Sequence, residues 1–379
     1  MTGTFHEFVN INGFVESRNF SMKNMKNEMA STSDNRVVLV TGGGGFLGGA
    51  IIASLVAKGE TVRSFSRGRY PQLDALGVEQ VQGDLCDAEA VARACRGVEA
   101  VFHTAARAGV WGSYQAYYRP NVEGTRNLIK ACRQGGVQRL IHTSSPSVVF
   151  NGRDMAGVDE SVPYPAAFHA NYPRTKAIAE QMVLEAAARG LRAVALRPHL
   201  VWGPGDTHLT PRILARAKRL RQIGDGANMV DTIYIDNAAH AHLLAEKRLK
   251  ADPLLSGRVY FISQDQPIAL WEMINHILAA GGFAPVTRTV SPAVAFAIGA
   301  FCEGLFKILH IRREPPMTRF VARELATSHW FNIQAAKTDL GYAPLVSTEE
   351  GLERLARWIQ QELLPMTRSA PVGLLDRNF

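Results

Sequence analysis

A glycine-rich turn is the feature of this sequence that most restricts its fold. Residues 41–48 read TGGGGFLG, directly after the apolar run 37–40 and directly before a helical pattern. An apolar run without alternation is typical of a parallel strand that is buried on both faces. Glycines between such a strand and a helix let a pyrophosphate approach the backbone at the helix N-terminus, although a purely structural turn is the alternative. The spacing predicts a dinucleotide-binding loop that contains Gly42, Gly45, Phe46, Leu47 and Gly48.

The residues that follow repeat the order strand, helix, strand. A helix is expected over 45–58 and a strand over 61–66, and the same rhythm returns up to residue 198. This alternation favours a doubly wound parallel sheet with helices on both faces, the Rossmann-type α/β architecture. Beyond residue 202 the elements become shorter and richer in proline, which indicates a smaller C-terminal substrate-binding lobe.

The chain is therefore expected to have four parts. Residues 1–35 lack a periodic pattern and are expected to be a disordered tail, or codons upstream of a later start. An NAD(P)-binding Rossmann domain is expected over 36–202, and mainly a substrate-binding lobe over 203–365, with the segment 229–245 returning to the sheet. Residues 366–379 are expected to be a loose tail.

Composition and charge narrow the classes of function. Of the 379 residues, 46% are hydrophobic and 20% are charged, as in an ordinary globular protein, and the formal net charge is +8. The basic residues form no dense run with interleaved aromatics, so an anionic ligand is expected and nucleic acid is not. The four cysteines form no CxxC pair, which predicts reduced thiols in a cytoplasmic protein. No spacing of His, Cys and carboxylates predicts a metal site.

The segment 292–313 is the most apolar stretch of the sequence. No apolar run reaches the length of about 18 residues that a spanning helix needs. Glu303 and Lys307 interrupt the segment, and Arg312 and Arg313 end it. It is either a core or substrate-lid helix, or an interfacial segment that makes peripheral membrane contact through apolar residues in lipid and arginines at head groups.

The end of the second predicted strand indicates which dinucleotide is bound. NAD sites usually place an acidic residue there for the ribose 2′-hydroxyl. Ser66 and Arg67 stand there instead, and a hydroxyl with a guanidinium suits a 2′-phosphate. NADP(H) is the expected cofactor and NAD(H) the alternative, in which case Arg67 is a solvated loop residue. Asp84 at the end of the third strand either meets the adenine or caps the next turn.

Tyr172 and Lys176 open another predicted helix. Because they are four residues apart, they lie on one face of it, and Pro173 fits the first turn. The pKa of a free tyrosine is near about 10. A neighbouring ammonium favours the phenolate, so Lys176 is expected to lower the pKa of Tyr172.

Five motifs, in order, carry a resemblance to a known family: TGGGGFLG, HTAA, HTSSPSVVF, YPRTK and LRPHLVWGPGD. They resemble the extended short-chain dehydrogenase/reductase superfamily and, within it, the 3β-hydroxysteroid dehydrogenase-like branch, over about residues 36–364. That branch includes sterol-4α-carboxylate 3-dehydrogenases and the bacterial 2-alkyl-3-oxoalkanoate reductases of long-chain olefin biosynthesis.

The resemblance implies four catalytic-site residues, Tyr172, Lys176, Ser145 and Asn121. Tyr172 would donate a proton to the carbonyl oxygen, Lys176 would also bind the nicotinamide ribose, and Ser145 would steady the substrate oxygen. Ser144 or Thr143 is the alternative to Ser145.

The further expected cofactor contacts are Leu85, Ala105, Lys176 and Pro198. Other side chains have weaker expectations, namely a cleft wall of Trp111 and Trp202, carboxylate binding by Arg107 and Arg212, and bystander roles for His199 and His208.

The leading hypothesis is NADP(H)-dependent reduction of the 3-oxo group of an apolar β-keto acid to the 3-hydroxy acid, in long-chain hydrocarbon biosynthesis. The resemblance also allows a 3β-hydroxysteroid or sterol-4α-carboxylate dehydrogenase, with a sterol substrate. A nucleotide-sugar epimerase or dehydratase, or a non-catalytic NADP-binding sensor, is a second alternative. A homodimer or a complex with pathway enzymes is compatible with each hypothesis.

Overall fold

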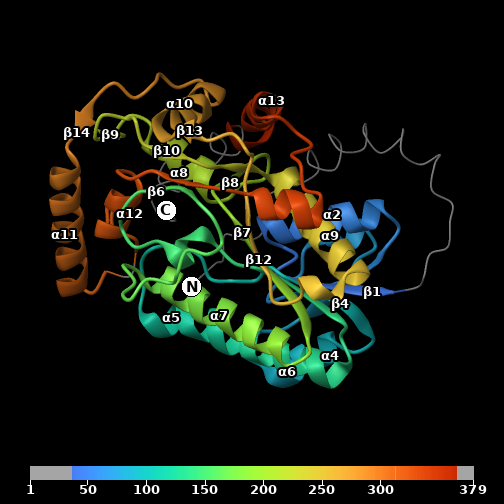
Figure 1. The fold of residues 1–379 in the computed structure, drawn as a ribbon. Coiled ribbons are helices and arrows are strands. Elements are labelled where there is room, and N and C mark those ends of the chain that lie inside the picture. Colours follow the sequence, from blue (N-terminus) through green and yellow to red (C-terminus); the bar gives the residue numbers. More distant parts are fainter. Residues whose placement is uncertain (1–35, 312, 365–379) are drawn as a thin grey trace.

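The computed structural model describes residues 36–311 and 313–364 (Figure 1). The tails predicted over 1–35 and 366–379 lie outside the described residues, and the boundary predicted between 202 and 203 remains a prediction. In the described part, none of the helices is both long enough and apolar enough to cross a bilayer.

A seven-stranded parallel sheet forms the centre of the fold, in the order β12-β7-β5-β4-β1-β2-β3. Its strands are β1 (Val37–Thr41), β2 (Thr61–Ser66), β3 (Glu79–Gln82), β4 (Val98–His103), β5 (Arg139–Thr143), β7 (Arg192–Pro198) and β12 (Val259–Ile262). The chain order reverses between β1 and β4, and ligands of such sheets bind at the carboxyl ends of the strands next to this point. The predicted dinucleotide loop follows β1 and therefore lies there.

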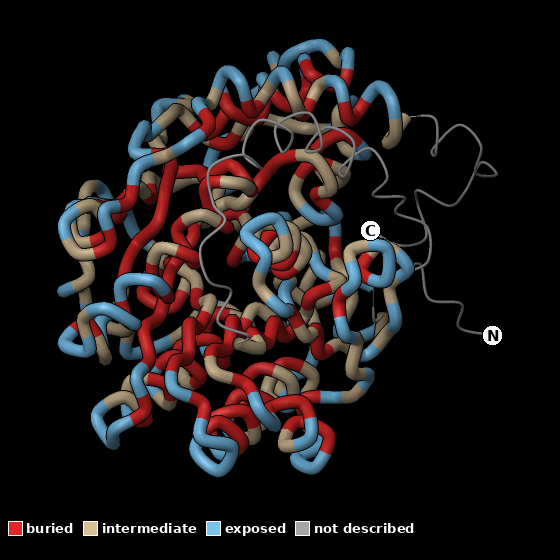
Figure 2. Tube along the Cα trace, turned by 90° about the vertical axis from the view of Figure 1, so that its right-hand side faces the viewer, coloured by how far each residue is buried: buried red, intermediate tan, exposed pale blue. Residues whose placement is uncertain are grey.

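Helices cover both faces of this sheet (Figure 1). One face is covered by α2 (Phe46–Ala57) and α9 (Ile235–Ala251), and the other by α4 (Ala88–Ala94), α6 (Gly124–Gly135) and α7 (Asn171–Ala188). Side chains of β1 alternate between the two layers, since Val38 and Val40 join the core under α2 while Leu39 joins the core under α4. Figure 2 shows buried residues throughout the interior and exposed ones along the outer turns. The doubly wound Rossmann-type prediction is confirmed.

Shorter elements build a lobe beside the carboxyl edge of the sheet (Figure 1). Its helices are α8 (Leu209–Arg216), α10 (Leu270–Ala280), α11 (Pro292–Ile308), α12 (Arg319–Glu324) and α13 (Thr348–Trp358). Its strands are β6 (Met155–Val158), β8 (Val201–Trp202), β9 (Gln222–Ile223), β10 (Met229–Val230), β11 (Ile233–Tyr234), β13 (Ile268–Ala269), β14 (Thr289–Val290) and β15 (His329–Phe331). Four of these form the sheet β13-β10-β15-β6, and the others pair as β11-β8 and β14-β9. The remaining elements are α3 (Pro71–Ala75), α5 (Tyr114–Tyr118) and the short turns Arg119–Glu123, Pro146–Val149, Pro253–Leu255, Ala336–Leu340 and Ile359–Leu363.

The predicted return of residues 229–245 to the main sheet is only partly correct. Helix α9 does pack on the sheet, but β11 before it pairs with β8 outside the sheet. The strand that joins the sheet is β12, which pairs with β7. The expectation failed because strand pairing depends on partners distant in sequence, which a local pattern does not identify.

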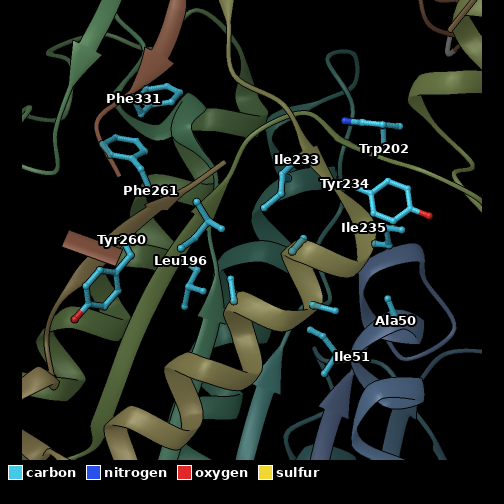
Figure 3. Close-up of a cluster of buried hydrophobic side chains, with 14 of the residues drawn as sticks. Ala50, Ile51, Leu196, Trp202, Ile233, Tyr234, Ile235, Tyr260, Phe261 and Phe331 are labelled. Atoms are coloured by element: carbon cyan, nitrogen blue, oxygen red, sulfur yellow. The ribbon is translucent and has the colours of Figure 1, made fainter. Parts of the chain in front are cut away.

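Trp202 was predicted to wall a substrate cleft, and the structure contradicts this. Its side chain is fully buried, and its ring lies edge-on to Tyr234 with 5.2 Å between the centroids. The indole Nε1 donates to Thr232 Oγ1 over 3.1 Å, so the polar end is satisfied inside the core. Figure 3 shows both rings in the cluster that also contains Ala50 and Ile235.

Three histidines are buried within the central layers. His103 lies between the hydroxyls of Thr41 and Thr125, and neither ring nitrogen of His142 has a hydrogen-bond partner in the described residues. His242 contacts Thr143 Oγ1 at 2.8 Å through Nε2 and donates from Nδ1 to a backbone carbonyl. Burial lowers the pKa of His103 to about 3 and that of His242 to about 4, and it also lowers the pKa of His142. All three are therefore neutral at pH values where an unfolded histidine begins to bind a proton.

This burial predicts a loss of stability in mild acid. The pKa of His242 is lower in the folded than in the unfolded chain, so the unfolded state gains protons first as the pH falls below about 6.5, and the free energy of unfolding decreases. Between about pH 7 and about pH 5 this one histidine contributes about 2 kcal/mol to the decrease. In urea unfolding, His242→Asn is expected to remove that share of the pH dependence, and His276→Asn at an exposed site is the control. An unchanged pH dependence in His242→Asn would contradict the assignment.

Candidate active site

The glycine loop forms a tight cradle at the N-terminus of α2. Gly42 adopts a φ of 73°, in the left-handed region that favours glycine. A Cβ on Gly48 would lie 2.3 Å from Gly42 O, so the loop and the helix approach too closely for any side chain there. The N-cap residue Gly45 provides no side-chain bond to the first turn of α2. The N–H groups of that turn remain available to an anion, and the cradle therefore fits a pyrophosphate.

The end of β2 carries the two residues that predicted NADP(H). Ser66 Oγ is buried without a hydrogen-bond partner in the described part of the chain, and Arg67 is exposed. An unpaired buried hydroxyl is costly unless a ligand or water satisfies it, so its position fits a polar group of a bound cofactor. Asp84 Oδ1 accepts from the backbone N–H of Cys86 over 2.8 Å, which is the capping role foreseen as one of its two options.

The other predicted cofactor residues converge on the same edge of the sheet. Ala105 lies against the glycine loop, since a Cβ on Gly42 would come within 2.9 Å of its Cα. Leu85 is buried, and its carbonyl accepts from the side chain of Asn127. Pro198 ends β7, and Phe46 and Leu47 open α2. The predicted cofactor contacts therefore lie along the carboxyl edge of the sheet, on both sides of the switch point between β1 and β4.

A buried hydrogen bond attaches α7 to the sheet. Lys176 Nζ donates to Thr143 O, at the end of β5, over 2.6 Å, and only 3% of the residue is exposed. Burial lowers the pKa of Lys176 to about 8, partly offset by the charge of Glu180 one turn later. Tyr172 stands one turn earlier on the same helix, as the four-residue spacing predicts.

The pKa of Tyr172 moves opposite to the expectation from sequence. Burial raises it to about 12, a hydrogen bond with Ser145 acts to lower it, and the charges of Glu324 and Tyr117 add to the increase. Lys176 is not among the groups that shift it. Desolvation of the phenolate therefore outweighs a lysine whose ammonium is directed at a carbonyl oxygen. In this environment Tyr172 remains a protonated phenol at neutral pH.

Of the three candidate hydroxyls at the end of β5 and just after it, only that of Ser145 is among the groups that shift the pKa of Tyr172. Ser145 begins the short turn Pro146–Val149, and its Oγ lies 2.9 Å from Ser147 Oγ and hydrogen-bonds Tyr172. Ser144 is buried, and its hydroxyl has no partner in the part of the chain that the structure describes. Thr143 Oγ1 is paired with His242. The geometry therefore favours Ser145 as the serine that faces a reacting oxygen.

Asn121 joins two segments of the site through hydrogen bonds of its side-chain amide. It lies in the π-helical turn Arg119–Glu123, a local irregularity that is frequent at functional sites. Its Oδ1 accepts from Arg107 N over 2.7 Å, and its Nδ2 donates to Arg107 O and to Thr175 Oγ1, each over 3.1 Å. Thr175 precedes Lys176 directly. The amide thus ties the segment after β4 to the first turns of α7.

Sequence reasoning missed Glu324, Tyr117 and Ser147 near the reactive hydroxyl. Glu324 ends α12, and burial raises the pKa of its carboxyl to about 8, so it is largely uncharged at neutral pH. Tyr117 is buried and donates from its hydroxyl to Trp111 O. Glu324 and Tyr117 do not lie in a recognised motif, and α12, which carries Glu324, is far from α7 along the chain. Only Ser147 had a local signal, because it lies two residues after Ser145.

Two histidines and two arginines were also singled out from the sequence, and they differ in their contacts. His199 Nε2 lies 2.7 Å from His329 Nδ1, and exposed His208 precedes α8, and the bystander role of both stays a prediction. Arg212 is ion-paired with Glu314, whereas exposed Arg107 holds its guanidinium 5.3 Å above the ring of Tyr117.

Other predicted features concern metals, thiols and Trp111. The described residues contain no group of His, Cys, Asp and Glu that could hold a metal ion. All four cysteines lie in the described part, and all are free.

Trp111 lies against the lobe, with its ring edge-on to Phe306 and its Nε1 donating to Ile311 O over 3.3 Å.

Known proteins resemble this chain in sequence and in fold. The model of the 3-beta hydroxysteroid dehydrogenase/isomerase family matches residues 39–292. A 2-alkyl-3-oxoalkanoate reductase of Stenotrophomonas maltophilia is 51% identical over 323 residues, which cover 84% of this chain and 98% of that protein. The decarboxylating sterol-4-alpha-carboxylate 3-dehydrogenase of Mus musculus is 33% identical, over 83% of this chain and 88% of that protein. The solved structure of MoeE5 with UDP-glucose and NAD is similar at a TM-score of 0.67 and 26% identity, covering 86% of this chain and 99% of that one.

The close packing at Gly48 gives a direct test of the cradle. Gly48→Ala is expected to push the loop away from α2 and to weaken NADPH binding by at least about tenfold, since the added Cβ meets a backbone oxygen. Gly49→Ala is the matched control, because its Cβ would stay 3.4 Å from the nearest atom outside its own helix. Fluorescence titration with NADPH measures both variants. Equal affinities in the two variants would show that the cradle does not hold the dinucleotide.

Proposed function

The chain belongs to the 3-beta hydroxysteroid dehydrogenase/isomerase family of NAD(P)-dependent oxidoreductases, and from that premise we propose that it reduces the 3-oxo group of a 2-alkyl-3-oxoalkanoate with NADPH. The observation that carries the proposal is the 51% identity to a reductase of that name over almost its whole length. The product is the 2-alkyl-3-hydroxy acid, and the reaction belongs to long-chain hydrocarbon biosynthesis.

The proposed mechanism assigns the proton to Tyr172. The nicotinamide supplies a hydride to the carbonyl carbon when it is bound. Ser145 holds the carbonyl oxygen beside the phenol, and Tyr172 transfers its proton to that oxygen as the C–O double bond is reduced. Lys176 stays in place through Thr143 O and binds the ribose with its remaining N–H groups. Asn121 is a positioning residue, since both ends of its amide are engaged by Arg107 and Thr175.

The protonation state of Tyr172 is the one that a reduction requires at its start. A phenol with a pKa of about 12 is protonated before the reaction, as a proton donor must be. Glu324 is largely neutral, so it does not repel an anionic substrate at the reactive hydroxyl. We assign the substrate carboxylate to Arg107 rather than Arg212, because Arg212 already pairs with Glu314. A basic group for that carboxylate agrees with the net charge of +8.

The cofactor preference proposed is NADPH over NADH. The supporting features are the unpaired hydroxyl of Ser66 and the exposed guanidinium of Arg67 at the end of β2, with no carboxylate there for a 2′-hydroxyl. Arginine and serine are both donors to phosphate oxygens, and the bidentate arginine contact is the stronger.

A second candidate is oxidation of a sterol-4-carboxylate, which the similarity to the mouse sterol dehydrogenase favours. In that direction Tyr172 would act as a base, and the positive charges of Lys176 and of an oxidised nicotinamide would have to lower its pKa from about 12. A panel that pairs a racemic 2-alkyl-3-oxo fatty acid with NADPH and NADH, and a 3β-hydroxysterol 4-carboxylate with NADP⁺ and NAD⁺, separates the candidates. Loss of nicotinamide absorbance only with the keto acid supports the reductase. Turnover only with the sterol, or cofactor binding without turnover, overturns it.

Tyr172→Phe tests the proton donor. Turnover of the keto acid is expected to fall by at least about a thousandfold, because the neighbouring hydroxyl of Ser145 is a much weaker acid than a phenol, while NADPH affinity stays nearly unchanged. Tyr118→Phe is the matched control, since its hydroxyl makes only a 3.4 Å contact with Arg126. Stopped-flow absorbance and a separate NADPH titration give the two readouts. If Tyr172→Phe retains activity, or loses NADPH binding, the assigned role is wrong.

Arg67→Glu tests the cofactor preference. The carboxylate repels a 2′-phosphate and can accept from a 2′-hydroxyl, so the ratio of kcat/KM for NADPH to that for NADH is expected to fall by at least about tenfold. The control is Arg69→Glu, which makes the same charge change two residues later at an exposed arginine paired with Asp74. The proposal fails if the ratio does not change, or if Arg69→Glu lowers it equally.

A further inference from the structure

Helix α11 (Pro292–Ile308) presents an uncovered apolar face. Of the eight large apolar side chains that are strongly exposed in the described residues, six belong to this helix and the residue after it: Val294, Ile298, Phe301, Leu305, Ile308 and Leu309. The exposed fraction reaches 70% at Phe301 and 75% at Ile308. Figure 1 shows α11 at the margin of the molecule, with α12 beside it.

These residues form one continuous stripe. They recur every three or four positions, so at 3.6 residues per turn they share a sector of about 100°. The opposite side of α11 is packed, since Ala295 is only 2% exposed and a Cβ on Gly299 would lie 2.6 Å from the carbonyl carbon of Thr318. Phe306 on that side meets Trp111. The helix is therefore apolar on two sides, of which the protein covers one.

A contiguous apolar stripe of this kind marks an interaction surface, whereas single exposed apolar residues do not. Full burial of one Phe or Ile side chain is worth roughly 1.5–3 kcal/mol, so covering several of them is a substantial driving force. The remaining question is what covers the stripe.

The charged residues around the stripe favour a binding partner with an anionic surface. Lys307, His310 and Arg313 are exposed at its C-terminal end. The acidic groups nearby are already neutralised, because Glu303 binds the backbone and guanidinium of Arg319, and Glu314 pairs with Arg212. A second copy of the chain would bring the same cations to this face, whereas a bilayer with anionic head groups complements them. An apolar helix face with cations beside it is the pattern of a helix that lies in a membrane interface.

We propose that α11 is a docking surface for an anionic lipid bilayer, with its stripe in the interface and Lys307 at the head groups. The proposal rests on the proposed function in one respect, that a long-chain substrate partitions into the bilayer. Two hydrogen bonds connect the end of the α11 segment with the start of α7, which carries Tyr172. Trp111 donates to Ile311 O, and the carbonyl of Gly112 accepts from the side chain of Asn171, the neighbour of Tyr172. Docking by α11 therefore brings the wall of the substrate lobe to the lipid surface.

The experiment compares two double variants of the full chain. Phe301→Glu with Ile308→Glu places two charges in the stripe, and Leu254→Glu with Leu345→Glu places them at two exposed leucines outside α11. Sedimentation with vesicles of phosphatidylcholine and phosphatidylglycerol is expected to show binding by the wild type and the control, and at least about tenfold weaker binding by the α11 variant. Binding is also expected to weaken on phosphatidylcholine alone and at high salt.

Three results would overturn the proposal: no vesicle binding by the wild type, equal binding by the α11 variant, or a wild-type dimer that the α11 variant converts to a monomer in light scattering. The last result would show that a second copy covers the stripe. Reduction of a short, water-soluble 3-oxo acid by both variants serves as a separate readout. If vesicle binding fails while this activity persists, only the docking proposal fails, and if the activity is absent in the wild type too, the proposed function fails.

Discussion

The hydrogen bond from Lys176 to Thr143 O holds the site together. It is short and buried, and it joins the first turns of α7 to the end of β5. Ser145 follows Thr143 by two residues and Tyr172 precedes Lys176 by four, so one contact brings the serine and the phenol to the same place. Asn121 strengthens the arrangement by tying Thr175 to the segment after β4. The sheet therefore supplies the rigid frame, and the reacting groups are positioned by backbone contacts rather than by one another.

Desolvation is the main cause of the pKa shifts of the titratable groups in this site. Loss of hydration lowers the pKa of Lys176 to about 8 and raises that of Tyr172 to about 12, although Tyr172 is only half-buried. Glu324 follows the same rule and is largely neutral. In the proposed mechanism, Tyr172 and the largely neutral Glu324 are therefore protonated groups near the reacting oxygen.

The sequence predicted the local parts of this arrangement well. The glycine loop, the strand 61–66 and the pair Tyr172 and Lys176 all depend on spacings within one strand–helix unit, and the structure has them as expected. The failures concern contacts between distant segments. Trp202 is a core residue because β8 pairs with β11, and Glu324 reaches the site because α12 packs beside it. The direction of the pKa shift at Tyr172 depends on how completely the fold excludes water, which no residue spacing reports.

In the proposed reaction, the 3-carbon of the substrate would receive a hydride from the bound nicotinamide while Tyr172 protonates the oxygen. Mass spectrometry of the product made with NADPH that carries deuterium in place of both C4 hydrogens tests this most directly. The account predicts one deuterium, bound to carbon 3 of the hydroxy acid, and none at that carbon when only the solvent is deuterated. A product without cofactor deuterium, or one labelled at carbon 3 from solvent, would contradict it.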